Sequence, residues 1–386
     1  MKYKLSEIAL FNPTESLKKG TLAKKVGMDK LQSFCRDIPD YEIAEFSGGM
    51  KFRNGDTIMA RITPCLENGK TAKVNILDTE EVGFGSTEYI VFRAIDGVTD
   101  EDYLYYLVCS PIVRDIAIKS MVGSSGRQRV QTDVVKGIEV ELPTLDEQRK
   151  IGSVLKILDD KIAVNNEINE NLEQQAQAIF ANEFLALESL PDGWKRGSLI
   201  DIADYLNGLA MQKYRPAADE VGIPVLKIKE LRQGCCDDTS EVCSPNIKTN
   251  YIIHDGDVIF SWSGSLLVDF WCGGICGLNQ HLFKVTSSVY DKWFYYAWTK
   301  HHLERFIAVA ADKATTMGHI KRDELSKAEV LIPNKADYNR IGSLLHPIYD
   351  LIITNRIESK KLAETRDTLL PKLMSGEIDI SEVDYE

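Results

Sequence analysis

The sequence predicts an α+β protein in which two tandem α/β domains are separated by two long antiparallel coiled-coil helices. Three observations predict this fold class. The chain repeats itself after 190 residues, each half opens on short β-rich segments broken by turn residues, and each half ends in a long apolar pattern with helical spacing. A chain of 386 residues is also too long for one ordinary core. We therefore expect a pseudo-twofold internal duplication.

The repeat is clearest where "IGSVLKILDD" (151–160) returns as "IGSLLHPIYD" (341–350). The same shift aligns 141–180 with 331–370 without a gap. Self-similarity at a fixed period marks a structural unit that the chain uses more than once. The predicted order is domain, helix, domain, helix, with boundaries at 1–143, 144–188, 189–333 and 334–386.

Residues 1–143 and 189–333 have the pattern of compact α+β domains. Short runs such as "EYIVFRAI" and "HLFKVTS" are rich in β-branched and aromatic residues and are bounded by Gly, Asn and Asp. At least one helix is expected in each domain, near 101–119 and near 290–308. This mixture predicts domains with much loop surface.

Both long helices begin with residue pairs that favour a helix N-terminus. Thr144 and Glu147 have the spacing of a capping box, and Asn334 and Asp337 take the same places in the second copy. Apolar residues then recur three and four apart, which predicts a coiled-coil seam. The seam residues are Ile151, Leu155, Leu158, Ile162, Leu172, Ala176 and Ile179 in the first helix, and Ile341, Leu345, Ile348, Ile352, Leu362 and Leu369 in the second. The alternative is an amphipathic helix packed on the core of its own domain.

The predicted seam contains Asn165 and Asn355, at equivalent positions of the repeat. A polar residue in a seam costs stability but fixes the register of the two helices. If the helices pack antiparallel about a pseudo-twofold axis, the two asparagines should meet near that axis. Pro347 has no counterpart in the first helix and is expected to kink the second.

Composition limits the classes of protein that the chain can belong to. Its net charge of −12 argues by itself against a free nucleic-acid binder, although binding depends on the charge of a local face. No apolar run is long enough to cross a bilayer and no leader is evident, so a cytoplasmic protein is expected. Eight cysteines in a chain of this length do not suggest a disulfide framework, and their loose cluster over 235–276 is a weak zinc signal. We expect no metal site.

Several stretches of the chain resemble the specificity subunit (S or HsdS subunit) of Type I restriction–modification systems. They are "KFRNGDTIMARITPCLENGKTAKV" (51–74), "GSTEYIVFR" (85–93), "ELPTLDEQRKIGSVL" (141–155), "LPDGWKRGSLIDIA" (190–203), "GIPVLKIKEL" (222–231), "GDVIFSWSGS" (256–265), "GLNQHLFKV" (277–285) and "LLPKLMSGEIDI" (369–380). No single motif decides the match. Their order, together with the repeat, makes it specific over nearly the whole chain.

This resemblance implies two target recognition domains, each of which reads one half of a split sequence in double-stranded DNA. It implies that the two helices space these domains and dock two methyltransferase subunits, which bind S-adenosylmethionine and methylate adenine at N6. It also implies a restriction enzyme that forms when motor-nuclease subunits, which use ATP and Mg, join the complex.

The residues themselves supply no catalyst. The Asn/Asp-Pro-Pro-aromatic motif and Gly-rich loop of adenine methyltransferases do not occur, nor does a GxxxxGK[ST] motif. The stretch "ENGK" (67–70) has the ingredients of a Mg²⁺ site but not its spacing. Six histidines include no HExxH. We therefore expect the chain to catalyse nothing alone.

In the first domain, two polar loops are candidates for reading DNA bases. The loop "GSSGRQRVQ" (123–131) carries two arginines and no acid, and "ARITPCLENGK" (60–70) adds a second basic segment. Such side chains donate to phosphates and to base edges. The expected contacts are Arg61, Thr63, Asn68, Lys70, Ser124, Ser125, Arg127, Gln128 and Arg129. The alternative is that these loops are merely solvated.

In the second domain, the corresponding segments are "KATTMGHIK" (313–321), "SWSGS" (261–265) and "NQHL" (279–282), which aligns with "STEY" (86–89). Cations in 208–216 and 227–230 would position phosphates without reading sequence. The expected contacts are Lys213, Tyr214, Arg215, Lys227, Lys229, Ser261, Ser263, Asn279, Gln280, His281, Lys313, Thr315, Thr316 and His319. The segment 279–281 could equally satisfy backbone groups at a strand edge. Because the two sets of loops differ, the DNA target should be asymmetric.

Other functions remain open at this point. The chain could be a coiled-coil interaction scaffold that does not contact DNA, or an orphan recognition subunit of a methylation-only system. A nuclease or methyltransferase with an unrecognised site is a further alternative.

Overall fold

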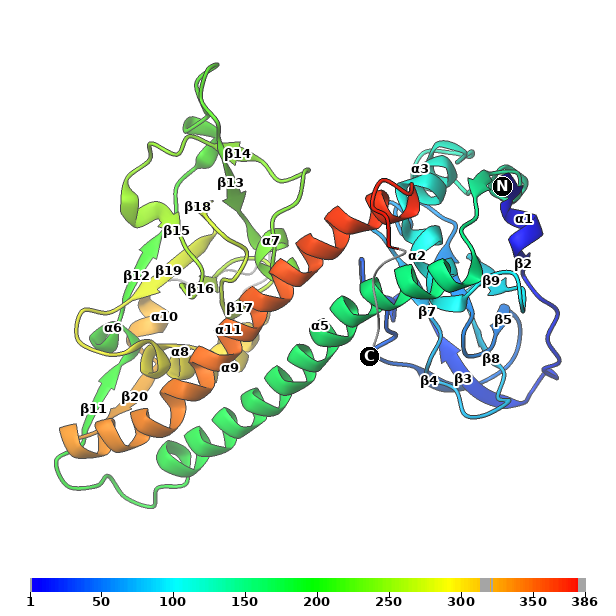
Figure 1. Ribbon diagram of the computed structural model, residues 1–386. Coiled ribbons are helices and arrows are strands. Elements are labelled where there is room, and N and C mark those ends of the chain that lie inside the picture. Colours follow the sequence, from blue (N-terminus) through cyan, green and yellow to red (C-terminus); the bar gives the residue numbers. More distant parts are fainter. Residues whose placement is uncertain (1, 313–319, 321, 381–386) are drawn as a thin grey trace. The chain divides into compact units, whose positions relative to one another are not determined.

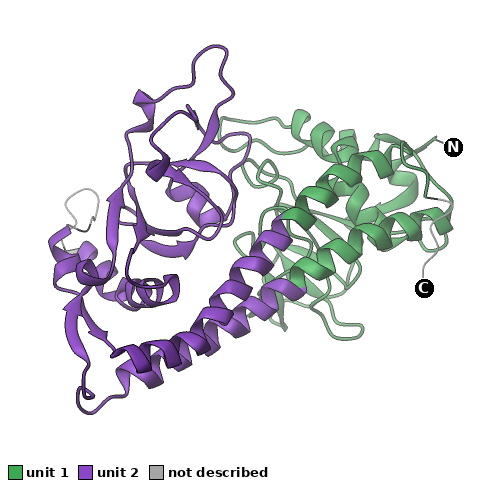
Figure 2. Ribbon diagram, turned by 60° about the vertical axis from the view of Figure 1, so that its left-hand side comes forward, with its two compact units in different colours: residues 1–163, 361–386 green, residues 164–360 purple. Residues whose placement is uncertain are grey.

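The computed structural model describes residues 2–312, 320 and 322–380. The chain divides into two compact units: unit 1 comprises 1–163 with 361–386, and unit 2 comprises 164–360 (Figure 2). Two long helices, α5 (Leu145–Phe180) and α11 (Lys335–Met374), each contribute residues to both units.

In its described residues, unit 1 contains two four-stranded sheets and one two-stranded ladder (Figure 1). The first sheet is antiparallel and has the order β2-β9-β6-β7. The second has the order β4-β3-β8-β5 and includes a parallel pair, β3 with β8. The strands are β1 (Lys2–Lys4), β2 (Ala9–Phe11), β3 (Leu22–Val26), β4 (Glu42–Glu45), β5 (Met50–Phe52), β6 (Thr57–Ala60), β7 (Thr71–Lys73), β8 (Gly83–Gly85), β9 (Tyr89–Ala94) and β10 (Glu139–Glu141), the last of which pairs with β1.

The described part of unit 2 repeats this strand order. Its antiparallel sheet is β12-β19-β16-β17, and its second sheet is β14-β13-β18-β15 with β13 parallel to β18. The strands are β11 (Lys195–Ser198), β12 (Asp204–Asn207), β13 (Ile223–Leu226), β14 (Val242–Cys243), β15 (Ile252–Ile253), β16 (Val258–Ser261), β17 (Leu267–Phe270), β18 (Cys276–Leu278), β19 (Leu282–Thr286) and β20 (Glu329–Ile332), the last of which pairs with β11. The two halves of the chain thus share one topology.

Short helices cover the sheets in both units. The helix predicted near 101–119 is two helices, because Pro111 has no N–H to continue the ladder and instead begins the second. The segment near 290–308 is likewise divided, at His302. The short helices are α1 (Leu5–Ile8), α2 (Glu101–Cys109), α3 (Pro111–Lys119), α4 (Thr132–Lys136), α6 (Leu199–Ile202), α7 (Ile228–Gln233), α8 (Lys292–His301), α9 (Leu303–Asp312) and α10 (Arg322–Ser326), with a π-helical turn at Ala181–Leu185 and 3₁₀ turns at Met211–Lys213 and Thr249–Tyr251.

Both predicted helix caps are confirmed. The Thr144 N–H donates to Glu147 at 2.8 Å, and the Glu147 N–H donates back to the Thr144 hydroxyl at 3.3 Å. In the second copy, the Asp337 N–H donates to the Asn334 side chain at 2.9 Å. These bonds satisfy backbone donors that the first turn of a helix leaves unpaired. The second helix continues through Pro347 without interruption.

Within unit 2, α5 and α11 run antiparallel. Asn169 contacts Asn355 at 3.0 Å, whereas Glu183, just beyond the end of α5, contacts Arg340 at 2.9 Å. Residue numbers along α11 therefore fall as those along α5 rise, which means that the two helices run in opposite directions. Asn165 lies fully buried against the second helix and donates to the Asn355 carbonyl at 3.5 Å. The Asn355 side chain itself donates to Asn169, so the pairing of the two equivalent asparagines stays a prediction.

The start of each long helix belongs to a globular core. Ile151 and Leu155 are buried with the apolar residues of unit 1, and Ile341 and Leu345 with those of unit 2. The predicted seam is thus apolar where each helix begins, and it carries the buried asparagines Asn165, Asn169 and Asn355 further along. Packing on the core of the helix's own domain, the alternative left open by the sequence, accounts for these apolar positions.

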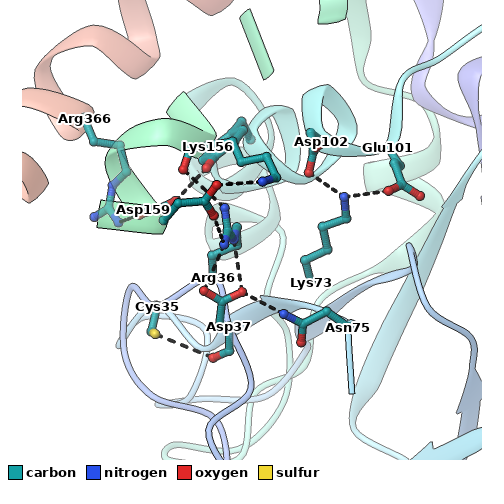
Figure 3. A network of polar contacts seen from close by, with 12 residues as sticks. Cys35, Arg36, Asp37, Lys73, Asn75, Glu101, Asp102, Lys156, Asp159 and Arg366 are labelled. Carbon is teal, nitrogen blue, oxygen red and sulfur yellow. Dashed lines mark hydrogen bonds and ion pairs between the residues drawn. The ribbon is translucent and has the colours of Figure 1, made fainter. Parts of the chain in front are cut away.

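A polar network ties α5 to the loops of unit 1 (Figure 3). Arg36, from the loop before β4, donates to Asp160 of α5 at 2.6 Å. Arg366 of α11 donates to Asp159 of α5 at 2.6 Å, and the same carboxylate accepts from Tyr106 of α2 at 2.6 Å. Buried charges need such partners to offset their lost hydration. The network therefore fixes the first half of α5 and the C-terminal part of α11 to the rest of unit 1.

In the part of the chain that the structure describes, no helix is both long enough and apolar enough to cross a membrane.

Candidate nucleic-acid interface

Three loops of unit 1 meet at one end of its antiparallel sheet. Strand β6 ends at Ala60, directly opposite Tyr89, where β9 begins. The segments that follow Ala60 and precede Tyr89 therefore leave the sheet at the same end. The third loop, 122–130, joins them through a bridge between Ile62 and Arg129.

Backbone hydrogen bonds hold these three loops together. The Arg61 N–H donates to the Glu88 carbonyl at 2.9 Å, and the Val130 N–H donates to the Arg61 carbonyl at 2.8 Å. The Thr63 N–H donates to the Gln128 carbonyl at 3.0 Å. The side chains on these loops are thus carried by an anchored backbone, as a recognition surface requires.

The 122–130 loop is a tight turn closed by paired backbone bonds between Val122 and Arg129, at 3.1 and 2.9 Å. Gly123 adopts φ +138°, and a Cβ there would lie 3.0 Å from the Arg127 carbonyl. Glycine is therefore required for the chain to turn at this point. The turn leaves Ser124, Ser125 and Arg127 exposed.

Arg129 pairs with Glu88 across two of these loops. Its Nε donates to the two carboxylate oxygens at 2.9 and 3.0 Å, and its Nη2 donates to Oε1 at 2.7 Å. Hydrogen bonding to Arg129 lowers the pKa of the Glu88 carboxyl and raises the pKa of the guanidinium. Arg61 lies 4.0 Å from the same carboxylate. Glu88 thus stands between two of the predicted DNA contacts.

The remaining predicted residues of unit 1 differ in how freely they can reach a ligand. Asn68 is exposed. Thr63 donates to the Met121 sulfur at 3.3 Å, and the Lys70 ammonium donates to the Met28 carbonyl at 2.7 Å, so both already have structural partners.

Unit 2 builds the corresponding place from different residues. Strand β16 ends at Ser261 opposite Leu282 of β19, and the Ile320 N–H donates to the Trp262 carbonyl at 2.9 Å, as Val130 does to Arg61 in unit 1. Beside Trp262 stands His281, whose Nδ1 lies 3.2 Å from the Ser263 hydroxyl. The same scaffold thus carries an arginine–carboxylate cluster in unit 1 and an indole, imidazole and hydroxyl in unit 2.

A hollow of about 510 Å³ with polar and apolar lining opens next to this place in unit 2. It brings together six of the predicted contacts with three further residues. The lining is Gln212, Arg215, Lys227, Ile228, Lys229, Glu241, Asn279, Gln280 and His281. Amide and cationic side chains in one hollow are suited to base edges and phosphates.

Several predicted residues of unit 2 have partners of their own. Lys227 pairs with Glu241 at 2.7 Å and Lys229 with Asp237 at 3.0 Å. The Asn279 side chain accepts from the His281 N–H at 3.2 Å, which is the backbone role that the sequence left open. Lys213, Tyr214 and Arg215 are exposed.

The expectation for Ser261 is wrong. Its side chain is fully buried, and its hydroxyl donates to the Ser265 carbonyl at 2.8 Å, so it closes the turn and cannot face a ligand. Lys313, Thr315, Thr316 and His319 lie outside the described residues.

Sequence reasoning missed Glu88, Gln212 and Glu241. The signal for Glu88 was present, because "STEY" (86–89) aligns with the candidate segment 279–282. An acidic side chain gives no direct sign of a DNA contact, since phosphates and most base edges are met by donors.

Among residues 2–312, 320 and 322–380, no group of three or more His, Cys, Asp or Glu side chains could hold a metal ion. All eight cysteines are free thiols.

A family model for the "Type I restriction modification DNA specificity domain" matches residues 1–174 and again 191–364. The chain belongs to this DNA specificity family. The match confirms the family that the sequence predicted and its role as a DNA specificity subunit, which is not itself an enzyme.

Individual relatives agree with the family. The specificity subunit of the type I restriction enzyme MjaIX from Methanocaldococcus jannaschii is 28% identical over 313 residues, which cover 75% of this chain and 71% of that subunit. The HindI specificity subunit from Haemophilus influenzae is 21% identical over 407 residues, covering 84% and 87%. A solved S subunit from M. genitalium aligns with a TM-score of 0.57 at 13% identity over 97% of this chain and 96% of its own, which supports the fold.

Proposed function

We propose that this specificity subunit reads a split, asymmetric DNA target, one half with each unit, through the loop clusters described above. The observation that carries the proposal is the shared scaffold with unlike side chains. The backbone bond from Val130 to Arg61 recurs from Ile320 to Trp262, yet the residues around it differ. Two copies of one reading device with different donors should read different bases.

We further propose that α5 and α11 form an antiparallel coiled coil that arose with the tandem duplication and docks two methyltransferase subunits. Exposed apolar residues support docking, since large apolar side chains at seven- and four-residue spacing share one helix face. They are Ile157, Val164 and Ile168 on α5, and Leu344 and Leu351 on α11.

In this proposal the chemistry belongs to the partners. The methyltransferase subunits would bind S-adenosylmethionine and take the flipped adenine. Restriction subunits, where present, would supply ATP and Mg chemistry. A complex of this kind would work in the cytoplasm, and the free cysteines fit a reducing compartment.

The test is to co-express the chain with its genomic neighbours and to map methylated adenines by single-molecule sequencing. We expect two short, unlike sequences separated by a fixed unread spacer. Replacing Arg127 and Arg129 with alanine should relax one of these sequences. If DNA affinity of the complex stays unchanged in that variant, the reading loops are misassigned and a scaffold without DNA contact by this chain becomes the better account.

A further inference from the structure

We infer that Glu88 is a positioning residue. It holds the Nε and Nη2 side of the Arg129 guanidinium, so that the free edge formed by Nη1 and Nη2 faces a guanine of one half-site. This inference rests on the proposed DNA-reading function. It assigns a role to an acidic residue within an interface that must meet an anionic ligand.

The geometry of the pair leaves one edge of the guanidinium unused. Arg129 donates to Glu88 only through Nε and Nη2, at 2.7 to 3.0 Å. None of the described residues accepts a hydrogen bond from its Nη1. A guanidinium has five N–H donors in a rigid planar fork, so Nη1 and the second N–H of Nη2 point away from Glu88. Two parallel donors of this kind match O6 and N7 of guanine.

Both members of the pair are fixed yet accessible. The Glu88 backbone carbonyl accepts from the Arg61 N–H. The backbone N–H and carbonyl of Arg129 both bond to the backbone of Val122. The Arg129 side chain is 46% exposed. An arginine already held by a partner loses less rotamer freedom when it binds a base. Glu88 therefore preorganises Arg129 without hiding it.

Pairing with the Glu88 carboxylate also makes Arg129 better suited to contact a base than a phosphate. Glu88 offsets one of the two positive charges that Arg129 and Arg61 bring to it, so the attraction of Arg129 to a charged phosphate is weakened. The oxygen and nitrogen acceptors of guanine are uncharged and depend on direction more than on charge. An arginine paired in this way should thus contribute little to sequence-independent binding and much to discrimination between bases.

Glu88 has no acidic counterpart at the equivalent position of unit 2. His281 takes the place of Glu88, and Trp262 takes the place of Arg61, as the pairing of Ser261 with Leu282 requires. Any effect of Glu88 should therefore be confined to the half-site that unit 1 reads.

The experiment uses the full chain in complex with its methyltransferase partners and duplexes that each carry one substituted base pair of the target. With Glu88→Gln, we expect discrimination at one G·C pair to fall about tenfold, the other pairs being unchanged. Because one acidic charge is lost, the slope of log affinity against log salt concentration should also become more negative, by roughly 0.9. Arg129→Ala should abolish discrimination at the same G·C pair.

Glu42→Gln is the matched control. Glu42 forms an exposed ion pair with Lys25 at 3.2 Å in the same unit, so this change removes an equal charge and leaves the loop cluster intact. It should leave discrimination at every pair unchanged.

Two results would overturn the inference. One is unchanged discrimination at every pair in Glu88→Gln, which would make the pair an ordinary surface contact. The other is an equal loss at all pairs of the half-site, which would give Glu88 a role in folding the loops. If the wild-type complex itself does not discriminate between duplexes, the proposed function fails, and this outcome is distinct from both.

Discussion

At the scale of single residues, Arg366 contacts two carboxylates that differ in burial. Asp159 is 5% exposed and accepts from Arg366 at 2.6 Å, whereas Asp367 is 60% exposed and accepts at 2.8 Å. The burial of Asp159 with Arg366, together with the hydrogen bond from Tyr106, makes this a pair whose loss leaves an uncompensated charge.

We expect Asp159→Ala to lower the free energy of unfolding by about 3–5 kcal/mol, measured by urea unfolding followed by circular dichroism. Asp367→Ala removes the other carboxylate from the same guanidinium and should cost under about 1 kcal/mol. If the two substitutions lower the free energy of unfolding equally, burial does not make the contact of Arg366 with Asp159 stronger than its contact with Asp367.

His302 gives unit 2 a stability that depends on pH. Burial lowers the pKa of the imidazole to about 4, while its Nε2 donates to the Glu329 carbonyl at 2.8 Å. The unfolded chain binds the proton near pH 6.5, so the folded state loses stability as pH falls from there toward 4.

Between pH 6.5 and 5 this loss should amount to about 1–2 kcal/mol. His302→Gln keeps an amide donor for Glu329 but cannot take up the proton. Its free energy of unfolding should therefore fall less over that range than that of the wild type. A variant whose pH dependence matches the wild type would show that His302 contributes nothing to it.

The residue scale also shows what the sequence could not supply. Arg129 was found because a loop with two arginines and no acid is unusual in a chain of net charge −12. Its partner Glu88 is 41 residues away, and only the pairing of three loops brings the two together. Ser261 was misjudged because nothing in "SWSGS" tells whether the hydroxyl turns inward to a carbonyl or outward to solvent.

At the scale of elements, features that depend on neighbouring residues could be predicted from the sequence, whereas the pairing of strands far apart in the chain could not. The capping pairs at Thr144 and Asn334 were predicted because they depend on residues three apart. The strand orders could not be predicted, since the parallel pairing of β3 with β8 joins segments far apart in the chain. The sequence predicts at least one helix near 101–119, and the segment holds two because the missing N–H of Pro111 divides it.

The asparagines between the long helices offer a test at this scale. Asn169 accepts from the Asn355 side chain at 3.0 Å and is buried, whereas Asn171 is exposed and donates to a carbonyl of its own helix. Asn169→Ala should lower the free energy of unfolding by about 1–3 kcal/mol, because it leaves a buried amide without its partner.

Asn171→Ala, two residues away on the same helix, should be neutral or slightly stabilising, since alanine is the better helix former. Thermal unfolding of the two variants beside the wild type decides between them. If both behave alike, the contact between Asn169 and Asn355 does not stabilise the helix pair.

At the scale of the whole molecule, the two units share their topology and differ in the side chains at one place. The strand orders β2-β9-β6-β7 and β12-β19-β16-β17 correspond strand for strand. What differs is local, namely the pair of Glu88 with Arg129 in unit 1 and the hollow beside Gln280 in unit 2. A repeated scaffold with unlike loops can change one specificity while the other is kept.

Independent reading by the two units has a quantitative consequence. Arg129 and Gln280 belong to different units, and among the residues that the structure describes they share no hydrogen-bond partner. Penalties from sites that act independently usually add to within about 0.5 kcal/mol. We therefore expect the binding penalties of Arg129→Ala and Gln280→Ala to add in the double variant, measured with the methyltransferase complex on its cognate DNA.

The methylated sequence of each single variant supplies the control for this additivity. Arg129→Ala should relax bases in one half of the target only, and Gln280→Ala bases in the other half only. A double variant that departs from the sum by more than about 1 kcal/mol, or a single variant that relaxes both halves, would mean that the units do not read separately. The repeat would then serve to build one joint surface, and the unlike loops would be parts of a single reader.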